Sequence, residues 1–214
     1  MIIAIDGSAA SGKGTLAKQV AAKFGYDYLD TGALYRAVAL SLLTTGMKSN
    51  DIDEKQAVKI ASTLDLSLTQ TAEIRTDRVA ALASIVAAIG RVRAELLALQ
   101  RAFAATPPSG KGVVLDGRDI GTIVLPDADL KFFIDADLDI RAERRTKELL
   151  QAGQSVIFRD VLADMKARDD RDRTRSVAPL KAADDAISID ASKMDAAAVL
   201  ALALSHVDRV CPSE

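Results

Sequence analysis

Short, mainly apolar runs recur along the chain and are separated by longer segments with helical spacing. The runs lie at residues 2–6, 26–30, 112–117, 130–136 and 186–190. Apolar runs this short are typical of strands buried on both faces of a parallel sheet. The segments between them repeat apolar residues every three or four positions, as amphipathic helices do. We therefore predict a doubly wound α/β fold with a five-stranded parallel sheet.

Acidic residues mark the ends of the predicted strands. They are Asp6, Asp30, Asp116 and Asp135. Open parallel sheets bind their ligands at the carboxyl ends of the strands. We expect these ends to carry the functional site.

Two segments depart from the alternation of strands and helices. Residues 48–106 are mostly helical, include a long Ala/Leu/Val/Arg stretch from 77 to 103, and are too long for a simple crossover. We predict that they form an inserted lobe. Residues 142–160 read as a charged helix broken near Gly153, which predicts a short lid.

The chain of 214 residues is long enough for one such domain. "PPSG" at 107–110 is the clearest hinge. We predict a single domain with core residues 1–47 and 107–214, an insert at about 48–106 and a lid at about 142–160.

Composition and charge narrow the class of protein. Aromatic residues make up only 4% of the chain, which favours helices packed by small residues over an aromatic-rich sandwich. The net charge of -2 argues against a general nucleic-acid or anionic-membrane binder. No basic leader or long apolar run occurs, and the single cysteine, Cys211, excludes an intramolecular disulfide. We expect a cytoplasmic protein.

Residues 7–15 have the spacing of a phosphate-binding loop. Gly7 is followed by Gly12 and Lys13, between a predicted strand and a predicted helix. Backbone N–H groups exposed by glycines point at phosphate oxygens, and the lysine neutralises charge. The predicted ATP-binding residues are Gly7, Ser8, Ala9, Ala10, Ser11, Gly12, Lys13, Gly14 and Thr15.

The hydroxyl that usually follows the lysine is displaced. Gly14 stands in its place and Thr15 comes one position later. The usual Ser or Thr is a direct Mg²⁺ ligand. We therefore predict no direct protein ligand: phosphates and water hold Mg²⁺, with Asp116 or Thr15 acting indirectly.

A second phosphate site is suggested by "DTGALYRA" at residues 30–37. Thr31 is a predicted N-cap and Arg36 lies one helical turn further on, so both can converge on a phosphate. A capping threonine beside a solvated arginine is the alternative. "DGRDIGT" at 116–122 places Arg118 and Asp119 directly after a buried strand, either in the ligand crevice or in a tight turn.

The run "RDDRDRTR" at 168–175 has two readings. If it is helical, Arg168, Asp172 and Arg175 share one face, while Asp169 and Arg173 point elsewhere. Alternatively, the run is a solvated salt-bridge face.

Three arginines, Arg141, Arg144 and Arg145, begin the predicted lid helix. Lid arginines that arrive on closure can stabilise the charge-spread transition state of phosphoryl transfer. An ordinary surface helix is the alternative. His206 and Cys211 lie away from every motif, and we expect both to be structural or exposed.

Four of these motifs, in this order, resemble those of bacterial cytidylate kinases, which are P-loop nucleoside monophosphate kinases. They are the phosphate loop, "DTGALYRA", "DGRDIGT" and "RDDRDRTR". The resemblance implies ATP-dependent phosphorylation of CMP and dCMP to CDP and dCDP by direct in-line transfer, with Mg²⁺. With the phosphate loop and the lid arginines, we predict a catalytic set of Lys13, Arg145 and Arg141; which lid arginine acts in the transition state stays open. The CMP-binding residues that the resemblance implies are Thr31, Tyr35, Arg36, Arg75, Arg118, Asp119, Arg168, Asp172 and Arg175.

Within that set, the resemblance assigns the residues to parts of the nucleotide. Thr31, Arg36, Arg118 and Arg175 contact the phosphate; Tyr35 lies beside the base; Asp119 and Arg75 recognise cytosine; Arg168 and Asp172 contact the ribose. The chain departs from the family at Ser8, where proline is common, and lacks a small β-rich segment before Arg75.

Two other functions remain open from the sequence: a related P-loop kinase for another small acceptor, and a nucleotide-binding switch without transfer. The arginines outside the loop favour transfer, because a switch needs no cradle for an acceptor phosphate. We expect nucleotides as the partners, a monomer, and no nucleic acid or membrane.

Overall fold

The computed structural model describes residues 1–46 and 52–210 and divides into two compact units. The first contains Met1–Leu29, Pro107–Thr174 and Ala178–Glu214; the second contains Asp30–Thr106 and Arg175–Val177. The predicted start of the insert at residue 48, and Cys211, lie outside the described residues. The second boundary, at 106/107, falls at the predicted hinge.

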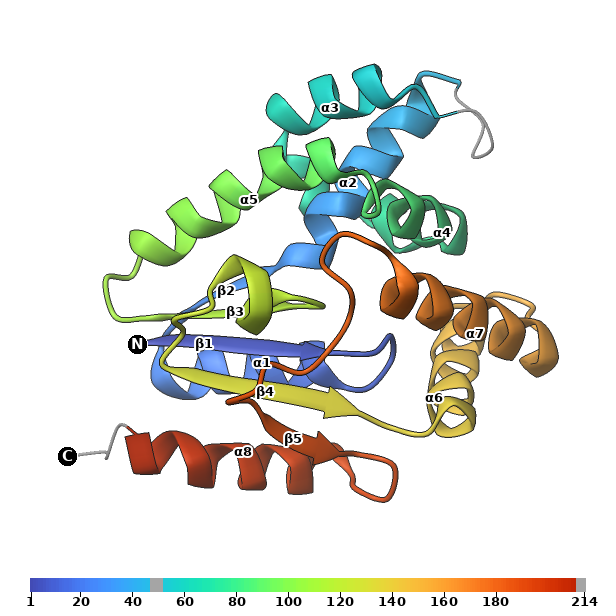
Figure 1. The fold of residues 1–214 in the computed structure, drawn as a ribbon. Coiled ribbons are helices and arrows are strands. Elements are labelled where there is room, and N and C mark those ends of the chain that lie inside the picture. Colours follow the sequence, from blue (N-terminus) through green and yellow to red (C-terminus); the bar gives the residue numbers. More distant parts are fainter. Residues whose placement is uncertain (47–51, 211–214) are drawn as a thin grey trace. The chain divides into compact units, whose positions relative to one another are not determined.

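The first unit is built on the predicted five-stranded sheet (Figure 1). Its strands are β1 Ile2–Gly7, β2 Asp27–Asp30, β3 Val113–Gly117, β4 Leu130–Asp135 and β5 Ile187–Asp190, in the order β2-β3-β1-β4-β5. β1 pairs in parallel with β3 and β4, and β4 pairs in parallel with β5. Because β1 is central and apolar on both faces, the strand that leads into the phosphate loop is buried.

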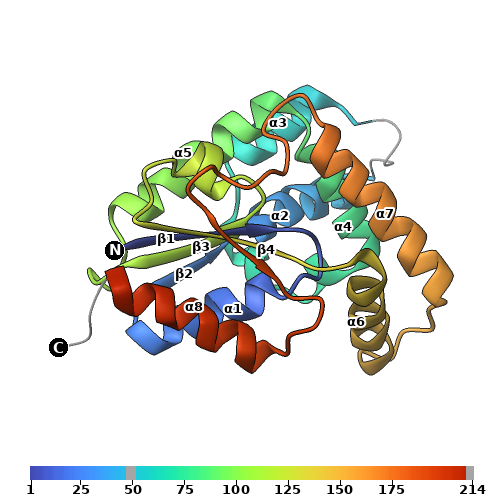
Figure 2. The same ribbon diagram turned by 60° about the horizontal axis from the view of Figure 1, so that its bottom comes forward.

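Helices α1 (Lys13–Phe24) and α8 (Ala196–Val210) pack on one face of this sheet (Figure 2). Gly25 ends α1 in the left-handed conformation, as its position after Phe24 predicts. Within the described residues, no helix is long and apolar enough to cross a membrane.

Helices α6 (Leu138–Gln151) and α7 (Phe158–Thr174) form a hairpin at the carboxyl edge of the sheet (Figures 1 and 2). The expected break near Gly153 is confirmed: this residue has a φ of 78° and lies in the connection between the helices. Ala142 and Leu149 of α6 pack against Val161 and Met165 of α7. The movement of this hairpin as a lid stays a prediction.

The second unit is helical, with its own apolar core. It contains α2 Thr31–Thr44, α3 Glu54–Ser62, the short 3₁₀ helices η1 Leu66–Gln70 and η2 Glu73–Arg75, α4 Asp77–Val86 and α5 Gly90–Ala105. The stretch from 77 to 103 is two helices, because Ile89 adopts an extended conformation before Gly90. This unit begins at Asp30 rather than near residue 48, since α2 packs with α3 and α4.

Candidate functional site

The loop after β1 has a backbone that requires glycine. Gly7 has a φ of 149°, and a Cβ placed on it would lie 1.9 Å from the carbonyl oxygen of Ile134. Gly12, with a φ of 93°, precedes Lys13, the first residue of α1. Since glycine has no side chain to cap a helix, the first N–H groups of α1 are open to a ligand. A helix N-terminus of this kind attracts phosphate.

Polar side chains of this loop are buried. The Lys13 ammonium donates to the carbonyl oxygen of Ser8 at 3.1 Å. The hydroxyls of Ser8 and Ser11 are buried, and neither has a hydrogen-bond partner in the described part of the chain. A bound phosphate supplies acceptors for donors of this kind. Thr15 is exposed on the first turn of α1.

Arg141 is fixed beside the phosphate loop. It is 2% exposed, and its guanidinium donates to the carbonyl oxygens of Ala9 at 3.2 Å and Ala136 at 2.7 Å. It also forms an ion pair with Asp169 of α7 at 2.6 Å. The loop is thus braced by a buried arginine that α7 holds in place.

The other two arginines of α6 have different surroundings. Arg144 donates to the carbonyl oxygens of Ala191 and Met194, after β5. The Arg145 side chain is 28% exposed and pairs with Glu148 of the same helix at 3.4 Å. Arg145 is therefore nearer the surface than Arg141.

Asp116 lies at the end of β3, close to the phosphate loop. Its buried carboxylate accepts a hydrogen bond from the Tyr28 hydroxyl at 2.9 Å. A Cβ placed on Gly14 would lie 3.4 Å from the other Asp116 oxygen, Oδ2. The carboxylate thus faces the residue that replaces the usual metal-binding hydroxyl.

The residues near this loop fit a magnesium ion held mostly by phosphates and water. Among the described residues, no group of three or more His, Cys, Asp or Glu side chains could enclose a metal ion. One carboxylate beside the phosphate loop is the donor that Mg²⁺ takes when it keeps several waters.

The turn after β3 carries a positioned arginine. Arg118 donates from Nε to Asp172 at 3.0 Å and from Nη1 to the carbonyl oxygen of Gly117 at 3.1 Å. Asp172 is buried on α7, and Asp119, the next residue of the turn, is buried too.

The charged run of α7 ends earlier than its pattern predicts. The helix ends at Thr174, so Arg175 lies beyond it and only Arg168 and Asp172 share the expected helical face. Asp169 and Arg173 point elsewhere, as expected: Asp169 pairs with Arg141, and exposed Arg173 pairs with Asp135.

In the second unit, Asp30 prepares the start of α2. It is the N-cap, and its carboxylate accepts from the Ala33 N–H at 3.0 Å. The prediction that Thr31 is the cap is wrong, because Thr31 is already the first helical residue and is buried. Asp30 also pairs with Arg36 at 2.6 Å, and the Arg36 Nε is buried without a hydrogen-bond partner among the described residues.

A buried arginine of this unit was missed in the sequence. The Arg93 guanidinium lies 5.4 Å from the centre of the buried Tyr35 ring and donates to the carbonyl oxygen of Ala87. Arg75, in contrast, is exposed at the end of η2. The available signal was that Arg93 adjoins Val92 and precedes Leu96 by three residues, which puts it on the apolar side of α5.

The predicted site residues are therefore divided between the units. The first unit holds the phosphate loop, Lys13, Arg118, Asp119, Arg141, Arg145, Arg168 and Asp172. The second unit holds Thr31, Tyr35, Arg36, Arg75 and Arg175. His206, which we expect to be structural or exposed, is half-buried and packs edge-on against Phe132.

A parallel sheet with a phosphate loop after its central strand defines the class of P-loop nucleotide-binding proteins. Solved structures share the fold: a protein from Eubacterium ventriosum (TM-score 0.55, 17% identity, 97% of this chain and 98% of that chain) and a gluconokinase from Sinorhizobium meliloti (0.50, 14%, 97% and 91%).

The cytidylate kinase family model matches residues 3–209. The chain is 53% identical to a cytidylate kinase of Paramagnetospirillum magneticum, over 96% of this chain and 97% of the relative. It is 50% identical to a cytidylate kinase of Xanthobacter autotrophicus, over 97% of each. The chain belongs to the cytidylate kinase family.

Proposed function

We propose that this protein transfers the γ-phosphoryl group of ATP to the 5′-phosphate of CMP or dCMP, giving ADP and CDP or dCDP. The observation that carries the proposal is a phosphate loop with a buried lysine, Lys13, in a member of this family. Arginines outside the loop support it, because aspartates hold Arg118 in the first unit and Arg36 in the second.

The transfer needs no covalent intermediate and no general base. An oxygen of the acceptor phosphate is already anionic and attacks the γ-phosphorus; the new P–O bond forms as the bond to the β-phosphate oxygen breaks, and ADP leaves. Positioning and charge stabilisation therefore supply the catalysis. Lys13 and the N-terminus of α1 neutralise the ATP phosphates in this proposal.

Arginines complete the charge stabilisation. Arg141 braces the loop through Ala9, and Arg145, nearer the surface of α6, contacts the transferring group. A magnesium ion, when bound, would supply further positive charge to the phosphate groups. Asp116, and Thr15 at longer range, would hold its water ligands.

On the acceptor side, Arg118 and Arg36 bind the CMP phosphate, with Thr31 and Arg175. Arg168 and Asp172 face the ribose, and Asp119 accepts from the exocyclic amine that cytosine has and uracil lacks. The stacked position of Arg93 supports adding it to the base-side residues with Tyr35. Arg75 stays a prediction.

A coupled assay of ADP release, run with CMP, dCMP, UMP, AMP and shikimate, tests the proposal. We expect CMP and dCMP to give the fastest release, and Lys13→Ala to abolish turnover while the protein stays folded. Faster release with another acceptor would favour a related kinase, and ATP binding without release would favour a switch. ADP release by Lys13→Ala at the wild-type rate would contradict the mechanism.

The substrates support the remaining parts of the proposal. ATP and CMP are small, soluble and intracellular, which fits a cytoplasmic enzyme that acts on free nucleotides rather than on nucleic acid. In this proposal a monomer suffices, because one chain carries both the phosphate loop and the arginines assigned to the acceptor. Sedimentation of the protein with and without nucleotides tests this.

A further inference from the structure

Asp6 is a buried carboxylate that the mechanism above does not use. The residue is 4% exposed and lies at the end of β1, directly before Gly7. Its Oδ1 accepts the N–H of Ile120 at 2.8 Å, and its Oδ2 accepts the N–H of Gly121 at 2.8 Å. Burial raises the pKa of Asp6 from 3.8 to about 7, so the group is ionised at pH 8.

The segment that Asp6 contacts lies outside the strand pairing of the sheet. The pairing of β1 with β3 ends where Asp6 meets Gly117. Arg118 and Asp119 follow and belong to no strand, and a single π-helical turn, η3 (Ile120–Val124), comes next. Asp119 does not cap this turn with its side chain. The first N–H groups of a helix have no acceptor within the helix. Asp6, at the end of β1, supplies acceptors for two of them.

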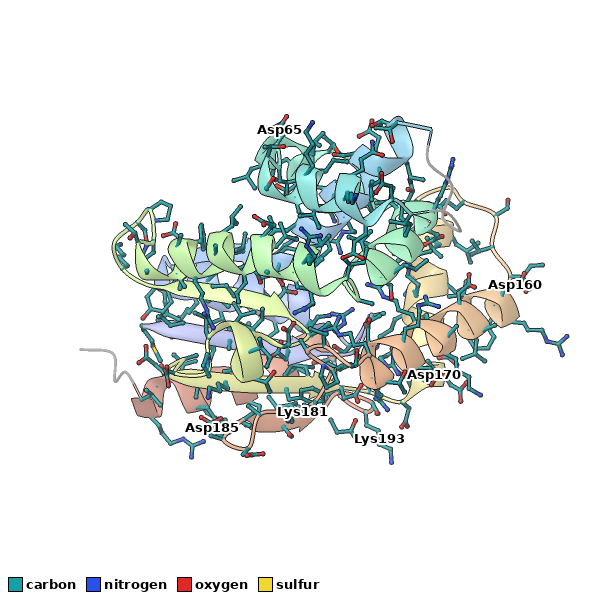
Figure 3. The ribbon with its side chains drawn as sticks, turned by 45° about the horizontal axis from the view of Figure 1, so that its top comes forward. Asp65, Asp160, Asp170, Lys181, Asp185 and Lys193 are labelled. Carbon is teal, nitrogen blue, oxygen red and sulfur yellow. The ribbon has the colours of Figure 1, made fainter. Side chains whose placement is uncertain are left out.

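Gly121 is packed closely against its neighbours. A Cβ there would lie 3.1 Å from Cδ of Lys131 and 3.5 Å from Oδ2 of Asp6. The Lys131 ammonium is itself held by the Pro126 carbonyl and by Asp185, labelled in Figure 3, at 2.7 Å. The turn is thus packed between the Asp6 carboxylate and a fixed lysine stem.

We propose that Asp6 is a positioning residue that holds the Arg118–Asp119 turn in place for the acceptor nucleotide. This role rests on the proposed function, in which both residues contact CMP. The β1 strand is paired on both sides, with β3 and β4, whereas the turn is outside these pairings. Loss of the carboxylate therefore displaces the turn more than the phosphate loop. It should impair the kinetics with CMP more than the KM for ATP.

Asp6→Asn, assayed at pH 8, tests the role with little change in volume. Asparagine keeps one oxygen acceptor, but its NH₂ group then faces an N–H donor. We expect kcat/KM for CMP to fall roughly 10- to 100-fold, with the KM for ATP changed less than about threefold. Hydrogen exchange at Ile120 and Gly121 should become faster. Asp190→Asn, at the end of β5, is the matched control and should leave the kinetics with both nucleotides and the hydrogen exchange unchanged.

Gly121→Ala approaches the same contact from the other side and leaves the Asp6 carboxylate intact. If Asp6→Asn fails to fold, this variant must show the same separation between CMP and ATP kinetics. Unchanged CMP kinetics and exchange, or equal losses for both nucleotides, would overturn the role of Asp6. A wild-type protein that releases no ADP with CMP would instead overturn the proposed function, and this role with it.

Discussion

At the scale of single residues, the proposed role of Asp116 is to compensate for the metal-binding hydroxyl that Gly14 lacks. Asp116→Asn keeps an oxygen for the Tyr28 hydroxyl, now 2.9 Å away, but removes the negative charge that faces Gly14. We expect the Mg²⁺ concentration needed for half-maximal activity to rise about tenfold, with stability nearly unchanged. A Mg²⁺ titration of the turnover rate measures this.

Tyr28→Phe is the control for that titration, because it removes only the hydroxyl that orients the carboxylate. It should raise the Mg²⁺ requirement less than Asp116→Asn does. Equal Mg²⁺ requirements in Asp116→Asn and wild type would show that the ion takes nothing from this carboxylate.

Arg93 and Arg75 offer a second comparison between residues. Arg93→Met keeps the aliphatic packing of α5 but removes the cation 5.4 Å from the Tyr35 ring. We expect the KM for CMP to rise about tenfold, which corresponds to about 1.4 kcal/mol of binding, because Tyr35 loses a buried stacking partner. Exposed Arg75→Met should raise it less than threefold, about 0.7 kcal/mol.

Steady-state kinetics with CMP at saturating ATP separate the two variants. A larger effect of Arg75→Met than of Arg93→Met would return the base-side role to Arg75, as the family resemblance implies.

Residues whose roles follow from neighbours in sequence were predictable, whereas those defined by distant contacts were not. The spacing of Gly7 and Lys13 is sufficient to predict a phosphate loop. The bond from Arg141 to the Ala9 carbonyl joins residues 132 positions apart, and no local pattern encodes it. Thr31 and Asp30 are both good caps, and the end of β2 decides between them.

At the scale of elements, α6 carries arginines of two kinds. Arg141→Ala would leave Asp169 buried without its partner and remove the brace from the loop. Breaking a buried ion pair costs about 3 to 5 kcal/mol. We therefore expect this variant to lose both stability and activity, as measured by urea unfolding and ADP release.

Arg145→Ala should lower kcat while the free energy of unfolding changes by less than about 1 kcal/mol, since the side chain is partly exposed and its ion pair with Glu148 lies near the surface. Lys147→Ala, on an exposed position of the same helix, is the control and should change neither quantity. A kcat equal to wild type in Arg145→Ala would remove this residue from the transfer step.

The helix hairpin also shows what periodicity can and cannot predict for an element. The charged pattern and Gly153 located the break between α6 and α7. The end of α7 at Thr174 could not be predicted, because the charged run continues through Arg175 with no residue that breaks a helix. The Leu180 N–H donates to the Asp172 carbonyl at 2.7 Å, so contacts made after the chain leaves the helix fix its last turn.

At the scale of the whole molecule, a net charge of -2 does not reveal how the arginines are distributed and held. Arg36, Arg118 and Arg141 each have an aspartate partner within 3.0 Å. This pairing fixes guanidinium geometry before a nucleotide arrives and explains why total charge did not reveal an anion-binding protein.

Asp6 should make the stability of the molecule depend on pH. Burial raises its pKa to about 7, with Asp119 adding to the rise, while the Ile120 and Gly121 N–H groups and Arg118 oppose it. Lys131, held by Asp185, packs on the same turn. Between about pH 4 and pH 7 the folded state therefore keeps a proton that the unfolded state has lost, so the free energy of unfolding falls as pH rises.

Three pKa units correspond to an upper limit of about 4 kcal/mol over that window. Asp6→Asn cannot titrate, so its curve should lack this slope. The lowered pKa of His206, caused mainly by desolvation, acts in the opposite direction, since the unfolded state then binds the proton more readily. Urea unfolding from pH 4.5 to pH 8 is therefore best compared in a His206→Gln background. If the protein with Asp6 and the Asp6→Asn variant gave parallel curves of unfolding free energy against pH, the Asp6 carboxyl would have the same pKa in the folded and unfolded states. The carboxylate that accepts from Ile120 and Gly121 would then be ionised throughout the window.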